Sequence, residues 1–271
     1  MLTKSSRRIL CFFLTLLMTI GICLLSAATI VRATLCSPVY MDRFLSSPEV
    51  KAYCDDIFEQ RISLLAENSG IPVRVFEASN NVGGYEETVV ERFYNNNDTT
   101  MFTKNKISVY ENLIIEFLEG NNEKYDASLV HNTALSAAEI YADSYGVKNT
   151  EAFREFIDNT INSYGRLSSS GLAVMLISFL LILSLHDNKK KTKKYFSSAF
   201  TSAGLSFIFT GIACLIFKVG KGAVITPDIY NDAVFKSINF MFLIQIAAGV
   251  IIVTTSTIFS LKSNKLIRNR K

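Results

Sequence analysis

The sequence has few of the residues and motifs on which enzyme active sites depend. Its 271 residues include two histidines, five cysteines and no tryptophan. Neither histidine belongs to an HExxH motif, no two cysteines form a CxxC pair, and there is no GxSxG nucleophile elbow. The segment KVGKGAV at 218–224 lacks the spacing of a phosphate-binding loop, and no EF-hand calcium loop occurs. We therefore expect no catalytic residue, no metal ligand, no cofactor and no enzymatic activity.

The scattered titratable side chains are expected to serve the protein surface. His131 lies in a predicted helix and is expected to be a structural or surface residue, while His186 stands beside Asp187 after an apolar stretch. Acidic pairs such as Asp55 and Asp56 are expected to be solvated rather than to hold calcium.

Charged residues are also missing from four long apolar stretches, at 9–30, 167–185, 196–217 and 237–261. A helix needs about 20 mostly apolar residues to cross about 30 Å of hydrocarbon. A buried core helix is an alternative for the second stretch, whose strongly apolar part is 171–185. Four such stretches in a chain with 49% hydrophobic residues argue against a soluble fold.

The first stretch resembles a signal peptide in being preceded by Lys4, Arg7 and Arg8. The apolar part of a signal peptide is usually about 7–15 residues long, whereas this stretch has 22 residues. Arg32 also interrupts the region where small residues would mark a cleavage site. We therefore expect an uncleaved membrane anchor.

The expected fold is an all-α integral membrane protein with four transmembrane helices and a mainly helical extracytoplasmic domain between the first two. Its expected parts, in chain order, are a tail (1–8), a first span (9–31), the helical domain (32–166), a second span (167–185), a basic loop (186–195), a third span (196–217), a short extracytoplasmic loop (218–236), a fourth span (237–261) and a basic tail (262–271).

Basic residues predict the orientation of the spans. The loop contains Lys189, Lys190, Lys191, Lys193 and Lys194. This loop and the two tails together carry 13 lysines and arginines and only one acidic residue. Because short basic segments stay in the cytoplasm, both termini and the loop are expected there. The region 33–168, with 21 acidic and 11 basic residues, is expected outside. Recognition of a specific anionic lipid or of nucleic acid is the alternative role of these lysines; we expect no nucleic-acid partner.

The outer domain shows several helix signals. Ser47 and Pro48 predict a helix start and Gly70 its end. The apolar stripe expected in this helix is Val50, Cys54, Ile57, Ile62, Leu64 and Leu65. Further helices are expected at 85–94, 107–118 and 125–145, and from 150 to Gly165. The alternating pattern of 71–78 predicts a short strand or an extended linker.

Two cysteines, Cys36 and Cys54, lie in the expected outer domain, where disulfides persist. A bridge between them would tie the segment after the first span to the first domain helix, and would contribute roughly 3 kcal/mol if unstrained. Two thiols are the alternative. Cys11, Cys23 and Cys214 lie in apolar stretches and are expected to be packing residues.

The residues just before the fourth span carry another helix start, at 226–228. We expect the first turns of that helix to lie outside the membrane and to pack beneath the outer domain. The residues expected to make this contact are Ile229, Tyr230, Val234 and Phe235.

The four spans contain no ionisable side chain, although transporters and pumps usually bury one. Gln245 is expected to form an interhelical hydrogen bond. The leading hypothesis is a non-enzymatic sensor, accessory or interaction protein, whose partners are the lipid bilayer, a protein bound by the outer domain, and further copies of itself. The alternatives are a subunit of an oligomeric channel or transporter and, third, a membrane-bound enzyme. Abundant Asn, Lys, Ser and Ile favour a bacterial cell membrane.

Overall fold

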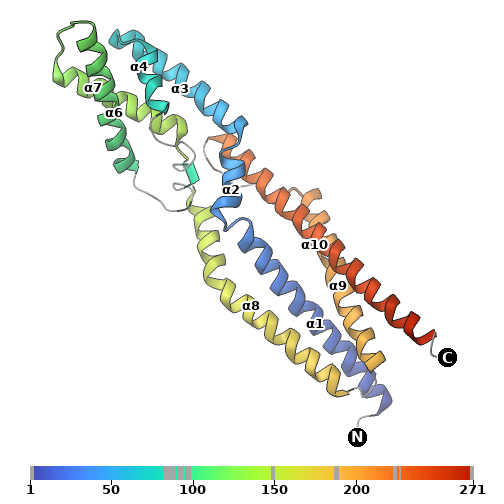
Figure 1. Cartoon of the computed structure of the whole chain (residues 1–271). Coiled ribbons are helices and arrows are strands. Elements are labelled where there is room, and N and C mark those ends of the chain that lie inside the picture. The colour runs from blue at the N-terminus through green and yellow to red at the C-terminus, as the bar shows by residue number, and fades with distance from the viewer. Residues whose placement is uncertain are drawn as a thin grey trace. The chain divides into compact units, whose positions relative to one another are not determined.

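A computed structural model describes residues 3–81, 89–90, 94, 99–147, 150–185, 189–221, 225 and 227–268. Within these ranges the regular structure is helical, without a strand, so the predicted all-helical class is confirmed (Figure 1). The chain divides into two compact units. The first comprises residues 1–37, 155–222 and 235–271, and the second comprises residues 38–154 and 223–234.

Four long apolar helices supply the first unit: α1 (Lys4–Ala33), α8 (Glu151–Leu185), α9 (Lys189–Ile216) and α10 (Asp228–Arg268). Each is long and apolar enough to cross a membrane. Large side chains such as Phe12, Phe209 and Ile251 are 66, 67 and 65% exposed. Such extensive exposed apolar surface is typical of a protein that is solvated by lipid. The four helices therefore indicate a membrane-embedded protein.

Glycines allow these helices to approach one another in pairs. A Cβ atom on Gly21 of α1 would lie 2.7 Å from the carbonyl oxygen of Gly171 in α8, and one on Gly171 would lie 3.0 Å from the Gly21 oxygen. Gly204 of α9 and Gly249 of α10 face each other in the same way, with corresponding distances of 2.8 and 2.6 Å. Only residues without a Cβ permit such close backbone contact. The crossings of α1 with α8 and of α9 with α10 therefore both depend on glycine.

Alanines of α9 pack against α1. Ala199 and Ala203 are fully buried in a cluster with Met18 and Ile22. The Thr19 hydroxyl also donates to the carbonyl of Ala199 at 3.4 Å. Ala199 and Ala203 thus serve packing within the chain.

The second unit is built mainly from α2 (Pro38–Leu45), α3 (Pro48–Ser69), α4 (Val73–Glu77), the 3₁₀ helix η1 (Ala78–Asn81), α6 (Thr99–Gly120) and α7 (Ala127–Tyr145). Helix α7 packs against both α3 and α6. The large side chains that are almost completely buried in this core include Phe58, Ile62, Phe76, Tyr110 and Ile114.

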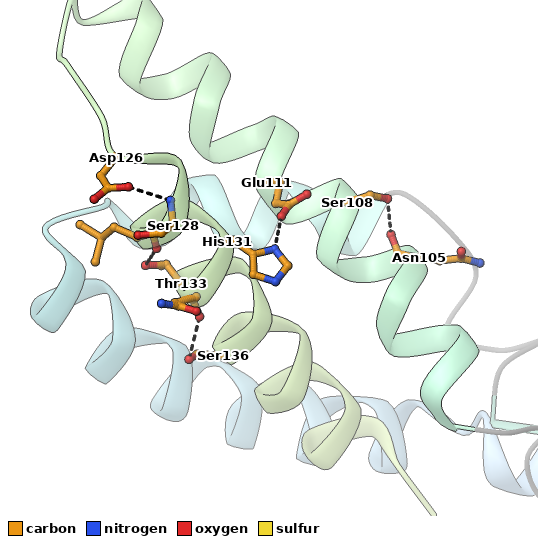
Figure 2. Close-up of polar contacts among 10 residues, drawn as sticks. Asn105, Ser108, Glu111, Asp126, Ser128, His131, Thr133 and Ser136 are labelled. Atoms are coloured by element: carbon orange, nitrogen blue, oxygen red, sulfur yellow. Dashed lines mark hydrogen bonds and ion pairs between the residues drawn. The ribbon is translucent and has the colours of Figure 1, made fainter.

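The predicted limits of α3 are confirmed. Pro48 occupies the first turn, where its missing N–H costs nothing, and Gly70 ends the helix with φ of 74°, a conformation that glycine adopts without strain. Helix α7 begins after Asp126, whose carboxylate accepts a hydrogen bond from the Ser128 N–H at 2.8 Å (Figure 2). This cap explains why α7 begins there.

Some local predictions were wrong. Residues 73–81 form α4 and η1 rather than a strand or an extended linker. Val75 and Phe76 are adjacent in sequence and both buried. Adjacent side chains of a strand point to opposite faces, so a half-buried strand would expose one of them, whereas a short helix can bury both. The helix expected to stop at Gly165 continues to Leu185 as α8. Helix α2 was not predicted.

Two further differences concern segment limits. Helix α9 begins at Lys189, so the lysines from there onward form its first turns rather than a loop. The helix predicted at 85–94 lies mostly outside the described residues.

Candidate functional site

Among the residues that the structure describes, no group of three or more His, Cys, Asp or Glu side chains could hold a metal ion. His131 of α7 contacts Glu111 of α6, with 2.5 Å between Nδ1 and Oε1 (Figure 2). Their side chains are 57 and 30% exposed, and a surface pair of this kind contributes about 0–1 kcal/mol. His186 lies outside the described residues. The contact therefore serves to join α6 to α7.

A cluster of aromatic side chains occupies the interior of the second unit. Phe58 of α3 packs on Tyr141 and Tyr145 of α7, with ring centroids 5.8 and 5.7 Å away, and the two tyrosine rings are 4.5 Å apart. Tyr230 of α10 is fully buried beside them, its hydroxyl 3.5 Å from the Tyr145 carbonyl oxygen and 3.6 Å from Cys54 Sγ. We call Phe58, Tyr141, Tyr145 and Tyr230 the aromatic cluster. It joins α3, α7 and the start of α10.

Tyr145 connects the aromatic cluster to a surface carboxylate. Its hydroxyl donates to Asp55 Oδ1 at 2.6 Å, while only 4% of Tyr145 is exposed. Burial, followed by the hydrogen bond to Asp55, raises the pKa of Tyr145. The phenol therefore remains a protonated donor at neutral pH and holds α7 to α3.

Helix α6 contributes a buried lysine to the same region. Lys106 is 5% exposed, and its Nζ donates to the Ser79 carbonyl oxygen at 3.0 Å. The same nitrogen lies 4.3 Å from the centroid of the Tyr141 ring. Burial lowers the pKa of Lys106, and the carbonyl and the ring face stabilise its charged form. Lys106 thereby links η1 and α6 to the aromatic cluster.

The start of α10 is held in the second unit by several contacts. Ala233 and Val234 are 3 and 0% exposed, and the Asn231 side-chain oxygen accepts from the Ile225 N–H at 2.5 Å. Of the four residues expected to pack there, Tyr230 and Val234 are fully buried, Ile229 is half-buried, and Phe235 is half-buried and belongs to the first unit. Residues 228–234 thus belong to the second unit, although α10 continues to Arg268 in the first.

The structure places the two cysteines of the predicted disulfide in different surroundings. All five cysteines lie within the described ranges and are thiols. Cys54 is fully buried against the Tyr230 hydroxyl, and Cys36 is half-buried. The bridge between Cys36 and Cys54 stays a prediction.

The polar residue singled out in the fourth span lies between two helices. Gln245 of α10 donates through Nε2 to Thr210 Oγ1 at 2.7 Å and to the Phe207 carbonyl oxygen at 3.3 Å, both in α9. Both bonds are donated by the amide nitrogen. They form a second contact between α9 and α10, in addition to the contact between Gly204 and Gly249.

The lysine-rich segment lies at the start of α9. Lys191, Lys193 and Lys194 are exposed, whereas the structure does not describe the side chains of Lys189 and Lys190. Lys193 Nζ lies 5.4 Å from the centroid of the Phe259 ring in α10. The role of these lysines in membrane orientation stays a prediction.

Comparisons with protein-family models, with curated proteins and with solved structures find no match to this chain. The candidate site is therefore defined by geometry alone. Sequence reasoning missed Asp55, Lys106 and Tyr145, because their partners are far along the chain: 90 residues separate Asp55 from Tyr145. Tyr230 was found because a helix-start pattern directly precedes it.

Proposed function

We propose that this chain is a non-enzymatic multi-pass membrane protein whose acidic helical domain, residues 32–166, binds a partner or senses a signal outside the cytoplasm. Its four apolar helices anchor it in the cell membrane. A change at the domain reaches the membrane through the aromatic cluster and the first turns of α10. The protein acts as a sensor or accessory subunit rather than as a catalyst.

Charge supports the placement of the domain outside. The two tails and the 186–195 segment hold 13 basic residues, a bias that keeps these segments in the cytoplasm. With four spans, residues 218–236 emerge on the same side as the domain. Residues 223–234 form part of the second unit together with 38–154, and this grouping supports a topology in which both segments lie on one side. The charge bias and the composition of this unit therefore favour the same topology.

The observation that carries the proposal is the burial of Tyr230. This residue is 0% exposed in the second unit, yet it lies on a 41-residue helix that continues as a membrane span. A tightly packed core transmits strain from one helix to the next, because it switches between alternative packings instead of deforming continuously. We therefore expect a rearrangement of the aromatic cluster either to expose Tyr230 or to displace the first turns of α10.

Energy transfer along the membrane helices tests this coupling. Two fluorophores, introduced as noncanonical amino acids at positions 191 and 261, report the separation of the ends of α9 and α10 in nanodiscs. We expect Tyr230→Ala to shift the transfer efficiency, because a buried aromatic is replaced by a cavity costing about 3–5 kcal/mol. The matched control is Asp232→Ala, an exposed residue in the same turn, which should leave the efficiency unchanged.

A specific result would show that the domain and α10 are not coupled. If Tyr230→Ala destabilises the domain but leaves the transfer efficiency equal to that of Asp232→Ala, the domain does not act on α10 and the sensor mechanism is wrong. The channel alternative is tested separately by ion flux into proteoliposomes. We expect no flux above that of empty liposomes, and a defined ring in mild detergent together with flux would favour the channel instead.

A further inference from the structure

The first unit contains a cavity that none of the features above uses. It has a volume of about 600 Å³ and lies between α1, α8, α9 and α10. Its walls include Met175, Phe179, Phe196, Phe200 and Phe259. This volume lies within the range of about 300–1,000 Å³ in which proteins bind small molecules. The cavity is thus large enough for a ligand, and its walls are mainly apolar.

The few hydroxyl groups in the walls are already engaged in hydrogen bonds. Ser256 donates to the Ser197 carbonyl oxygen at 2.8 Å, and the two serine hydroxyls are 3.0 Å apart. Thr255 donates to the Ile251 carbonyl oxygen at 2.8 Å. A polar ligand would lose its hydrogen bonds to water without an equal return, so the occupant must be hydrocarbon. In a membrane helix bundle the abundant hydrocarbon is the acyl chain of a lipid.

A cation marks one end of this cavity. Phe196, Ser197 and Phe200 come three, four and seven residues after Lys193, so the four share one face of α9. Phe196, Ser197 and Phe200 line the cavity, and Lys193 is one turn before them. Its ammonium nitrogen lies 5.4 Å from the centroid of Phe259, another wall residue, within the range of a cation–π contact.

We propose that the cavity holds one acyl chain of an anionic phospholipid, whose phosphate is bound by Lys193. The apolar walls recognise the chain, and the lysine distinguishes anionic lipids from zwitterionic ones, because a lysine near the membrane surface attracts anionic headgroups. The lipid comes from the leaflet that the start of α9 faces. This site is separate from the aromatic cluster and does not depend on the sensor hypothesis.

Native mass spectrometry of the full chain in mild detergent tests the site. Phosphatidylglycerol and phosphatidylcholine with the same acyl chains are titrated separately. We expect one phosphatidylglycerol to be retained, and to bind more tightly than phosphatidylcholine. Lys193→Gln should weaken phosphatidylglycerol binding about fivefold, the usual effect of one lysine at a membrane surface, and leave phosphatidylcholine binding unchanged. Lys191→Gln, which removes the same charge from another face of α9, is the matched control.

Filling the cavity provides a second variant. Ile252 lines it from α10 and is half-buried. Ile252→Trp should reduce the binding of both lipids while the far-ultraviolet circular dichroism stays helical. The proposal is overturned if phosphatidylcholine binds as tightly as phosphatidylglycerol, or if Lys193→Gln and Lys191→Gln weaken binding equally. Formation of a dimer that excludes phosphatidylglycerol would also overturn it, because a second copy would then cover the cavity.

Discussion

The crossing of α1 and α8 predicts that a single methyl group at Gly171 destabilises the membrane unit. A Cβ atom at this position would lie 3.0 Å from the Gly21 carbonyl oxygen, 3.1 Å from the Leu25 nitrogen and 3.3 Å from Leu24 Cβ. The two closest atoms belong to the α1 backbone and cannot rotate away. Helices α1 and α8 must therefore separate by a few tenths of an ångström along their contact.

The size of the effect follows from two opposing contributions. Overpacking a close contact costs about 1–3 kcal/mol, whereas replacing glycine by alanine within a helix stabilises it by up to about 1 kcal/mol. Gly165 lies on the same helix, and a Cβ there would meet nothing within 4 Å. Gly165→Ala therefore has the helix-forming gain without the clash. The difference in stability between Gly171→Ala and Gly165→Ala isolates the clash, and we expect about 1–3 kcal/mol.

Reversible unfolding in mixed micelles, with increasing sodium dodecyl sulfate and detection by circular dichroism, gives the free energy of each variant. Gly171→Ala should unfold at a lower dodecyl sulfate fraction than the wild type, and Gly165→Ala at an equal or higher fraction. Gly21→Ala should be at least as damaging as Gly171→Ala, because its Cβ would lie only 2.7 Å from a carbonyl oxygen. Equal free energies for Gly171→Ala and Gly165→Ala would refute the proposed crossing.

Three further outcomes are expected. Phe58→Ala should cost the helical domain about 3–5 kcal/mol, measured by thermal unfolding, because a side chain that is 2% exposed leaves a cavity. Gln245→Leu should cost about 0.6–2 kcal/mol in the dodecyl sulfate assay through loss of its bond to Thr210, and an unchanged value would contradict that bond. Burial and Asp55 raise the pKa of Tyr145 above its ordinary 10.0, so the stability it contributes is present below pH 10 and is lost as pH rises further. Tyr145→Phe should therefore reduce the alkaline decline in unfolding free energy by up to about 1.4 kcal/mol per pH unit, and identical slopes would argue against this account.

The membrane helices could be predicted because their signal is local. A span is defined by consecutive apolar residues. The apolar stretch at 196–217 and helix α9 differ chiefly at their starts, because α9 begins earlier, at Lys189, and includes the lysines. Lysine is a good helix former, so charge does not end a helix even where it ends a hydrophobic stretch. Gly165 is a different case: one glycine disfavours a helix by only about 1 kcal/mol, and α8 continues through it.

The interior of the domain was harder to predict. In α3 the expected stripe included Ile57 and Leu64, yet Phe58 is the residue buried there and Leu64 is 62% exposed. A helix with apolar residues on several sides does not show which side faces the core, because that depends on the position of α7. Lys106 was missed for a related reason: a lysine is normally solvated, and only the fold provides the Ser79 carbonyl and the Tyr141 ring that accompany its burial.

The most direct test of the account is which side of the membrane each segment faces. Glu123→Cys in the helical domain and Lys191→Cys at the start of α9 both introduce exposed thiols, in a Cys36→Ala background. A membrane-impermeant maleimide applied to intact cells should label position 123 at once, and position 191 only after the membrane is permeabilised. Labelling of position 191 but not of 123 in intact cells would contradict the orientation, and equal labelling of both would contradict the four-span arrangement.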